Sequence, residues 1–373
     1  MTSMEGRKVS APDYAPPPGL LERIYAGAAR RDAEPAFPRE PFGELGRIGI
    51  LGAPVPDPIS SGGRRSSFAE EWQTLRMVTK ADSSVGRILD GHFNSVERVS
   101  VLAPEPLRSR ELEAVAAGEL LIGLWGGNPL PGEGEPARIV DSGDGLVVDG
   151  VKTFCSGATG VDRAVVILPG TDTGPPVMVY VAISENLEID RTWYRASGMR
   201  ASESHRVVFH EVPVLAILGE PGELVKEPYY SRDATRTAVT WAGMADRAVD
   251  GALETLAAKS GGEPDDIVAL AAGKMLTAQQ TMDRWIEHAA GHADADPEAS
   301  MIGFSTSLRE SIAASCREIL DEGARACGSH PFATAADLDR ARRDLEVLLL
   351  QHRLEPALVH AGGQAIRSRS RGS

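Results

Sequence analysis

The hydrophobic pattern changes character twice along this chain of 373 residues, and these changes limit the possible folds. Apolar residues recur at helical spacing from about residue 18 to residue 118. Short β-branched runs bounded by Gly, Pro and Asp then occupy residues 120 to 215, and helical spacing returns afterwards. Helices followed by strands and then by helices indicate an α+β protein. We predict a disordered arm at 1–18, an N-terminal α-helical domain at 19–118, a central antiparallel β-sheet or barrel domain at 119–218 and a C-terminal four-helix bundle at 228–373.

Local turn and capping signals agree with this division. Residues 141–145 read DSGDG between two apolar runs, and glycines there allow the tight reversal of a β-hairpin. Asp82 or Ser83 can cap a following helix, because each side chain can accept hydrogen bonds from free backbone N–H groups. Pro264, Asp265 and Asp266 together have the composition of a helix start.

Composition and charge exclude several classes of function. The formal net charge is −14, and an acidic chain repels phosphate backbones, so we expect no nucleic-acid partner. No apolar run approaches the roughly 18 residues of a membrane span, and the N-terminus lacks the apolar core of a signal peptide. The three cysteines show no CxxC spacing, which disfavours a disulfide framework and a metal site. These features predict a cytoplasmic protein.

Three strings carry a resemblance to a known family. They are GLVVDGVKTFCSGATGVDRAVVI at 145–167, WYRASGMRASESHRVVFHEVPV at 193–214 and LDRARRDLEVLLLQH at 338–352. They resemble, in the correct order, successive motifs of the acyl-CoA dehydrogenase superfamily, which includes a branch of flavin-dependent monooxygenases. The resemblance implies a flavin-dependent oxidoreductase with FAD as cofactor, or alternatively FMN or reduced flavin, in a homotetramer or homodimer. The family's R-x-x-FG segment, which binds the FAD diphosphate, has no counterpart in residues 257–267.

The resemblance also indicates where the flavin would bind. A flavin ring needs hydrogen-bonding groups along its polar edge and close approach of the backbone. The matching positions lie at the end of the first string and in the middle of the second. The residues expected to contact the cofactor are Phe154, Cys155, Ser156, Gly157, Arg200, Ser202 and Ser204.

Two histidines are the candidate catalytic residues. In standard members of the family a glutamate removes the substrate α-proton, and His352 stands in its place here. The monooxygenase branch is similar in carrying a histidine at this position, often with a second on an N-terminal helix, where this chain has His92. A neutral imidazole can donate or accept a proton near pH 7. For both histidines, packing in the interior is the alternative interpretation.

Three functions follow from the resemblance and stay open at this point. The first is α,β-dehydrogenation of an acyl-CoA thioester with hydride transfer to flavin N5, which would use an electron-transfer flavoprotein as partner. The second is monooxygenation with reduced flavin that a separate flavin reductase supplies. The third is a degenerate subunit without catalytic activity.

Overall fold

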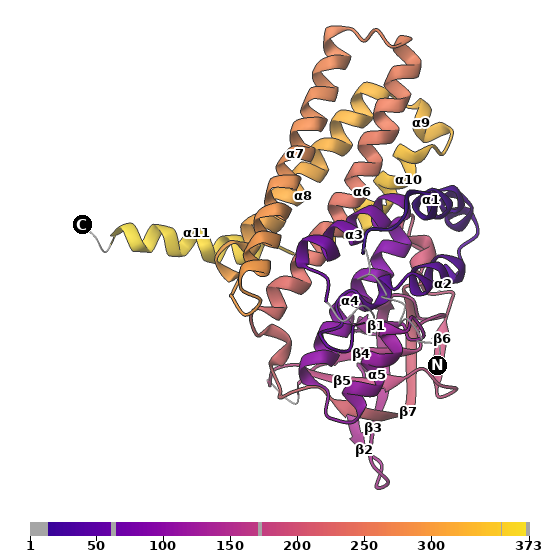
Figure 1. Ribbon diagram of the computed structural model, residues 1–373, viewed down its shortest axis with the longest axis vertical. Helices are drawn as coiled ribbons and strands as arrows, with labels where there is room; N and C mark the ends of the chain where they lie inside the picture. The colour runs from indigo at the N-terminus through magenta and orange to yellow at the C-terminus, as the bar shows by residue number, and fades with distance from the viewer. Residues whose placement is uncertain (1–13, 61–64, 171–173, 352, 371–373) are drawn as a thin grey trace, which may run out of the picture.

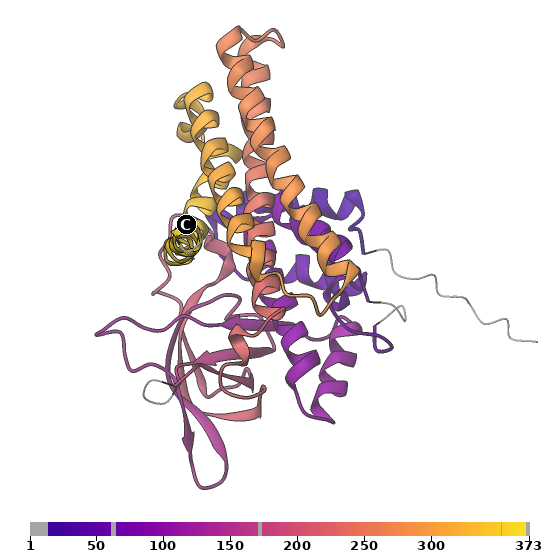
Figure 2. The same ribbon diagram turned by 90° about the vertical axis from the view of Figure 1, so that its left-hand side faces the viewer.

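The computed structural model describes residues 14–60, 65–170, 174–351 and 353–370, and it confirms the predicted α+β architecture. Figures 1 and 2 show long helices rising from one end of the molecule and the β-sheet at the other end, with α3 and α4 between them. The N-terminal helices are α1 (Pro18–Ala33), α2 (Arg39–Arg47), α3 (Phe68–Ala81), α4 (Ser83–Leu102) and α5 (Leu107–Ala116), with a 3-10 turn η1 at Ile50–Gly52.

The helix starts follow the capping chemistry of the sequence. Ser67 and Glu70 form a capping box at the start of α3. One carboxylate oxygen of Asp82 accepts hydrogen bonds from the backbone N–H groups of Ser84 and Val85, so Asp82 is the N-cap of α4 as predicted. Asp265 caps α7 in the same way.

The sheet is antiparallel as predicted, except for one pair of strands. Strand β1 runs parallel to β4, and the other pairs are antiparallel. The main path through the sheet is β1-β4-β5-β7-β3-β2, and β6 also pairs with β7. The predicted hairpin at DSGDG is confirmed as the turn between β2 and β3. The strands are β1 (Ile122–Trp125), β2 (Arg138–Asp141), β3 (Leu146–Cys155), β4 (Arg163–Leu168), β5 (Val177–Ala182), β6 (Leu187–Asp190) and β7 (His205–Ile217).

Four of the C-terminal helices pack as the predicted bundle. Their apolar stripes meet in one core that includes Met282, Cys316 and Leu345. The last helix projects away from the bundle (Figure 1). The bundle helices are α6 (Tyr229–Ser260), α7 (Asp266–Ala295), α8 (Ile302–Cys327) and α10 (Asp337–Leu349), followed by α11 (Glu355–Ser370); short helices are α9 (His330–Ala333), η2 (Arg200–Ser202) and η3 (Glu223–Val225).

A buried ionic network joins the N-terminal helices to the bundle. The fully buried Arg236 of α6 lies 2.6 Å from Glu71 Oε1 of α3 and 2.7 Å from Glu97 Oε2 of α4. Burial alone would raise the pKa of Glu97, but Arg236 and Arg232 outweigh it and lower the pKa to about 2. Removing one partner of such a network leaves an uncompensated buried charge, so the three helices are tied by residues that depend on one another.

The predicted arm at 1–18 is only partly within the described residues. Residues 1–13 lie outside them, whereas Tyr14 is buried, and its carbonyl accepts a hydrogen bond from Thr74 of α3. Pro18 already begins α1. The end of this segment is therefore packed against the protein, contrary to the prediction. Among the described residues, no helix is long and apolar enough to cross a membrane.

Candidate functional site

The two segments predicted to bind the cofactor meet at the end of β3. Phe154 and Gly157 adopt left-handed backbone conformations, with φ of 54° and 72°. This turn directs the Gly157 N–H to the carbonyl oxygen of Ser202 at 2.7 Å, and the next N–H, of Ala158, donates to the Glu203 carbonyl. A Cβ on Gly157 would lie 2.9 Å from a methyl carbon of Val161, so the turn requires glycine there.

Three buried serine hydroxyls form a chain across this junction. Ser202 Oγ donates to the Met199 carbonyl at 2.6 Å and lies 2.7 Å from Ser204 Oγ, which lies 2.9 Å from Ser156 Oγ. Each hydroxyl has one proton to donate. Because Ser202 gives its proton to Met199, Ser204 must donate to Ser202, and Ser156 must donate to Ser204. Ser156 therefore has no proton left to donate, and its oxygen can only accept a hydrogen bond from a ligand.

Aromatic side chains lie beside the hydroxyl chain. Phe154 is 57% exposed, a high value for a large apolar side chain, and its ring packs edge-on against Trp193 at 4.9 Å and Tyr194 at 6.5 Å. Cys155 is fully buried, and this burial raises the pKa of its thiol. The Cys155 side chain is therefore kept neutral and away from solvent, and only its backbone can take part in a binding site.

The segment before these serines is fastened to helix α10. The Met199 N–H donates to Asp344 Oδ1 at 2.5 Å, and Arg343 donates to the Ser197 carbonyl at 2.6 Å. Gly198 touches α10 so closely that a Cβ there would lie 2.1 Å from the Arg343 carbonyl oxygen. Burial raises the pKa of Asp344 to about 7. The bundle thus fixes the position of the segment that carries Arg200 to Ser204.

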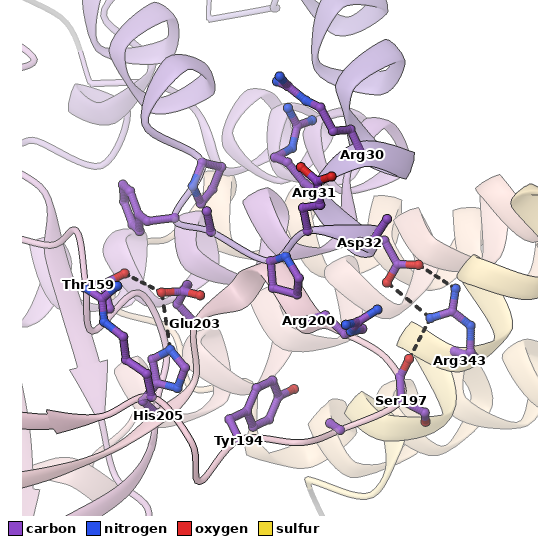
Figure 3. A pocket seen from close by; sticks show the side chains of 18 of the residues that line it. Arg30, Arg31, Asp32, Thr159, Tyr194, Ser197, Arg200, Glu203, His205 and Arg343 are labelled. Atoms are coloured by element: carbon purple, nitrogen blue, oxygen red, sulfur yellow. Dashed lines mark hydrogen bonds and ion pairs between the residues drawn. The ribbon is translucent and has the colours of Figure 1, made fainter.

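A cavity of about 1350 Å³ opens next to this junction, between the α1–α2 connection, the 191–205 segment and the start of α10 (Figure 3). The predicted residue Arg200 lines it, as do Tyr194, Glu203 and His205. Its charged lining consists of Arg30, Arg31, Arg39, Arg191, Arg195, Arg200 and Arg343, with Asp32, Glu34, Glu40, Glu203 and Asp339.

Several of these charges are already paired. Arg343 forms ion pairs with Asp32 at 2.7 Å and Asp339 at 2.9 Å. Glu203 Oε2 accepts from Thr159 Oγ1 at 2.6 Å and lies 3.3 Å from His205 Nε2. Burial would raise the pKa of Glu203, but its contacts with His205 and Thr159 lower it. Glu203 is therefore held as a carboxylate.

Of the two candidate catalytic histidines, the structure describes only His92. His92 is fully buried in α4, with Nδ1 accepting from the Ile122 N–H and Nε2 donating to the Leu51 carbonyl, both at 3.0 Å. Burial lowers the pKa of His92 to about 4. With both ring nitrogens bonded to the backbone, the geometry favours the packing interpretation. His352 lies outside the described residues, and α10, which was predicted to carry it, ends at Leu349.

The sequence interpretation did not select Tyr194, Glu203 or His205 as site residues. A signal existed for His205, since it belongs to the Ser202–Arg206 stretch that carries two of the predicted serines. Tyr194 belongs to an aromatic pair in a loop, which is weak evidence without the fold. Glu203 becomes recognisable only when the turn brings it beside Thr159.

Comparison with known proteins identifies relatives of this chain, although no protein-family model matches it. The chain is 30% identical over 261 residues to the amino sugar nitrososynthase RubN8 of Streptomyces rubradiris, covering 65% of this chain and 60% of the relative. It is 25% identical over 221 residues to a dibenzothiophene monooxygenase of Rhodococcus erythropolis, covering 56% and 50%. A probable acyl-CoA dehydrogenase of Bacillus subtilis, YngJ, is 24% identical over 247 residues, covering 62% and 64%. The matches thus span between half and two thirds of these relatives.

Solved structures agree on the fold over nearly the whole chain. KijD3, solved in complex with FMN and a dTDP-linked amino sugar, superposes with a TM-score of 0.80 at 20% identity and 96% coverage of both chains. FMN-bound TdsC from Paenibacillus sp. A11-2 gives a TM-score of 0.76 at 17% identity, covering 94% of this chain and 96% of TdsC. Together with the relatives, these structures confirm the predicted resemblance and fold class.

The buried state of His92 makes a testable prediction about stability. The folded pKa is about 4 and the ordinary value is 6.5, so between these values the unfolded chain binds a proton that the folded chain does not. Stability that is present above pH 6.5 is therefore lost as the pH falls. From pH 7 to pH 5, we expect the unfolding free energy of the wild type to drop by about 2 kcal/mol more than that of His92→Gln.

Urea unfolding at the two pH values measures this difference. Asp344, whose raised pKa acts in the opposite direction, is present in both proteins and cancels. His360→Gln, in the exposed helix α11, should behave like the wild type. An equal pH dependence of the wild type and His92→Gln would show that His92 is not held neutral by burial.

Proposed function

Since the acyl-CoA dehydrogenase superfamily is the family on which the motifs, relatives and fold agree, we propose that this protein is a reduced-flavin-dependent monooxygenase that uses FMN. Two relatives support this proposal. The nitrososynthase and the dibenzothiophene monooxygenase each match more than half of the length of this chain. FMN is preferred to the FAD of the sequence prediction because KijD3 and TdsC were solved with FMN.

The residues at the junction fit a flavin. An isoalloxazine ring is flat, aromatic and polar along one edge, and it needs both an apolar surface and hydrogen-bonding partners. The exposed ring of Phe154 offers the first, and the hydroxyl chain that ends at Ser156 offers the second. We propose that Phe154, Ser156 and Gly157 hold the ring, with Ser202 and Ser204 behind Ser156.

The chemistry divides between the cofactor and the protein. Bound reduced flavin would supply the two electrons with which one atom of O₂ becomes water while the other enters the substrate. The chain positions the ring, holds the substrate in the cavity and moves protons. For the last task we propose His352, at the position eight residues after Asp344 where standard family members carry glutamate.

The direction in which the three serine hydroxyls donate their protons favours binding of reduced flavin over oxidised flavin. Ser156 can only accept a hydrogen bond, and flavin N5 carries a proton when reduced but only a lone pair when oxidised. An accepting hydroxyl therefore suits reduced flavin, and two facing lone pairs disfavour oxidised flavin. This matches an enzyme that receives reduced flavin from a separate reductase.

The cavity lining suits a substrate that has both polar and apolar parts. Its walls combine the arginines and carboxylates named above with apolar residues such as Ala36, Phe37 and Pro38. The charged groups can pair with a polar substrate such as an amino sugar, whereas an acyl chain gains free energy only from the apolar part. Acyl-CoA dehydrogenation has no specific support among the contacts of the site.

Oxygen incorporation tests the reaction type. We expect the protein, supplied with FMN, NADH, a separate flavin reductase and ¹⁸O₂, to place ¹⁸O in a dTDP-linked amino sugar or in dibenzothiophene, as read by mass spectrometry. Omitting the reductase should remove the label. Anaerobic bleaching of oxidised FMN by an acyl-CoA would instead establish a dehydrogenase, and failure to bind flavin in either redox state would favour a non-catalytic subunit.

Breaking the hydroxyl chain tests the preference for reduced flavin. In Ser202→Ala, Ser204 is free to donate to Ser156, and Ser156 can then donate to oxidised N5. We expect the ratio of oxidised to reduced FMN dissociation constants to fall roughly three- to tenfold, since one hydrogen bond is exchanged for another. Anaerobic fluorescence titration measures both constants. Ser142→Ala, in the exposed β2–β3 turn, is the matched control, and an unchanged ratio in Ser202→Ala would contradict the assigned direction.

Replacing the proposed acid–base residue should affect turnover and not binding. We expect His352→Ala to lower the rate of oxygen incorporation at least about 100-fold, the usual worth of general acid–base catalysis, with FMN affinity unchanged. Stopped-flow turnover and a flavin titration on the same preparation separate the two effects. His360→Ala serves as the control. Full turnover of His352→Ala would remove this residue from the mechanism.

A further inference from the structure

We propose that the arginine-rich side of the cavity binds the phosphate groups of a nucleotide-type ligand, with Arg200 as the central contact. The site itself requires only an anion. The identity of the ligand, the FMN phosphate or the diphosphate of a sugar nucleotide, rests on the proposed function.

The cavity lining has more basic than acidic residues, whereas the whole chain has more acidic than basic residues. The whole sequence has 53 acidic residues against 39 Lys and Arg, whereas the cavity lining holds seven arginines against five carboxylates. A protein with a net charge of −14 repels phosphate over most of its surface, so an anion can bind only where basic groups are concentrated. Arginine presents a planar fork of donors that matches phosphate oxygens.

The arginines of the lining differ in how far other side chains of the described residues already engage them, and Arg191 is near enough to Glu203 to help lower the pKa of that carboxyl. Arg343 is committed to Asp32 and Asp339, and Arg31 is committed to Asp82. Within the part of the chain that the structure describes, Arg191 and Arg200 form no hydrogen bond or ion pair. Figure 3 shows Arg200 between the Asp32–Arg343 pair and the Glu203 carboxylate.

The carboxylate closest to this part of the cavity lining already has partners within the protein. Glu203 Oε2 accepts a hydrogen bond from Thr159 Oγ1 and lies 3.3 Å from His205 Nε2. Arg200 has no such partner among the described residues, so its guanidinium group is the one that can bind a phosphate.

The size of the cavity permits a ligand larger than a simple anion. Its volume of about 1350 Å³ exceeds that of sites for single small anions and is sufficient for a mononucleotide or a nucleotide sugar. Inorganic phosphate alone would leave most of this space to solvent. Together with the arginines, this volume favours a larger molecule that carries a phosphate group.

Binding measurements with matched ligands test the site. We would titrate the full chain with FMN and riboflavin by fluorescence, and with dTDP by calorimetry. Riboflavin lacks the phosphate and reports on the ring alone. We expect Arg200→Gln to weaken FMN or dTDP at least tenfold and to leave riboflavin unchanged, as loss of a charge-assisted contact predicts. Arg200→Lys should restore part of the loss. The exposed Arg284→Gln, on α7, removes the same charge elsewhere and should have no effect.

The pattern of losses identifies the source of the phosphate. If FMN binding falls to the level of riboflavin, the site holds the cofactor phosphate. If dTDP weakens while FMN is retained, the site holds the substrate diphosphate. FMN and dTDP affinities that are unchanged in both Arg200→Gln and Arg191→Gln would overturn the proposal. The second variant also covers the case in which Arg200→Gln does not fold. If the wild type binds dTDP through Arg200 but binds no flavin, the proposed function is wrong and the proposed phosphate site is still supported.

Discussion

The candidate site depends on one buried contact between the Asp344 carboxylate of α10 and the Met199 backbone N–H. This bond fixes the bundle to the start of the segment that carries Arg200, Ser202 and Ser204. Burying a carboxylate is costly, as its raised pKa shows, and the cost is acceptable only if the hydrogen bonds are well placed. Together with the hydrogen bond from Arg343 to the Ser197 carbonyl, this contact joins two segments that are 145 residues apart in the sequence, and a shift of α10 would displace the serines and the cavity wall together.

The local backbone of this segment is itself unfavourable. Met199 and Glu203 adopt left-handed conformations with φ of 55° and 49°, which cost non-glycine residues of order 1 kcal/mol each. The surroundings supply the compensation. Asp344 holds Met199, and the N–H groups of Gly157 and Ala158 hold the carbonyls of Ser202 and Glu203. A turn kept in this form against its own preference points to a functional requirement for the placement of its side chains.

The sequence predicted the order of elements and several caps because these depend on local chemistry. Asp82, Asp265 and the DSGDG turn act through groups within a few residues of themselves. The parallel pairing of β1 with β4 and the burial of Tyr14 depend on contacts between distant segments, and no local pattern encodes them. For the same reason the serines could be proposed from family motifs, whereas the partners of His92 and the cavity role of Glu203 could be found only in the fold.

The proposed selectivity for reduced flavin and the proposed phosphate contact both depend on residues 199–205. The hydroxyl chain runs from Ser202 through Ser204 to Ser156, and Arg200, which lines the cavity, lies just before Ser202 in the sequence. A ligand that draws Arg200 toward itself must act on the backbone that orients Ser202, because only Ala201 lies between these two residues. We therefore expect binding of a phosphate-bearing molecule to be coupled to the hydrogen bonding of Ser156, with the bond from the Met199 N–H to Asp344 limiting how far the turn can move.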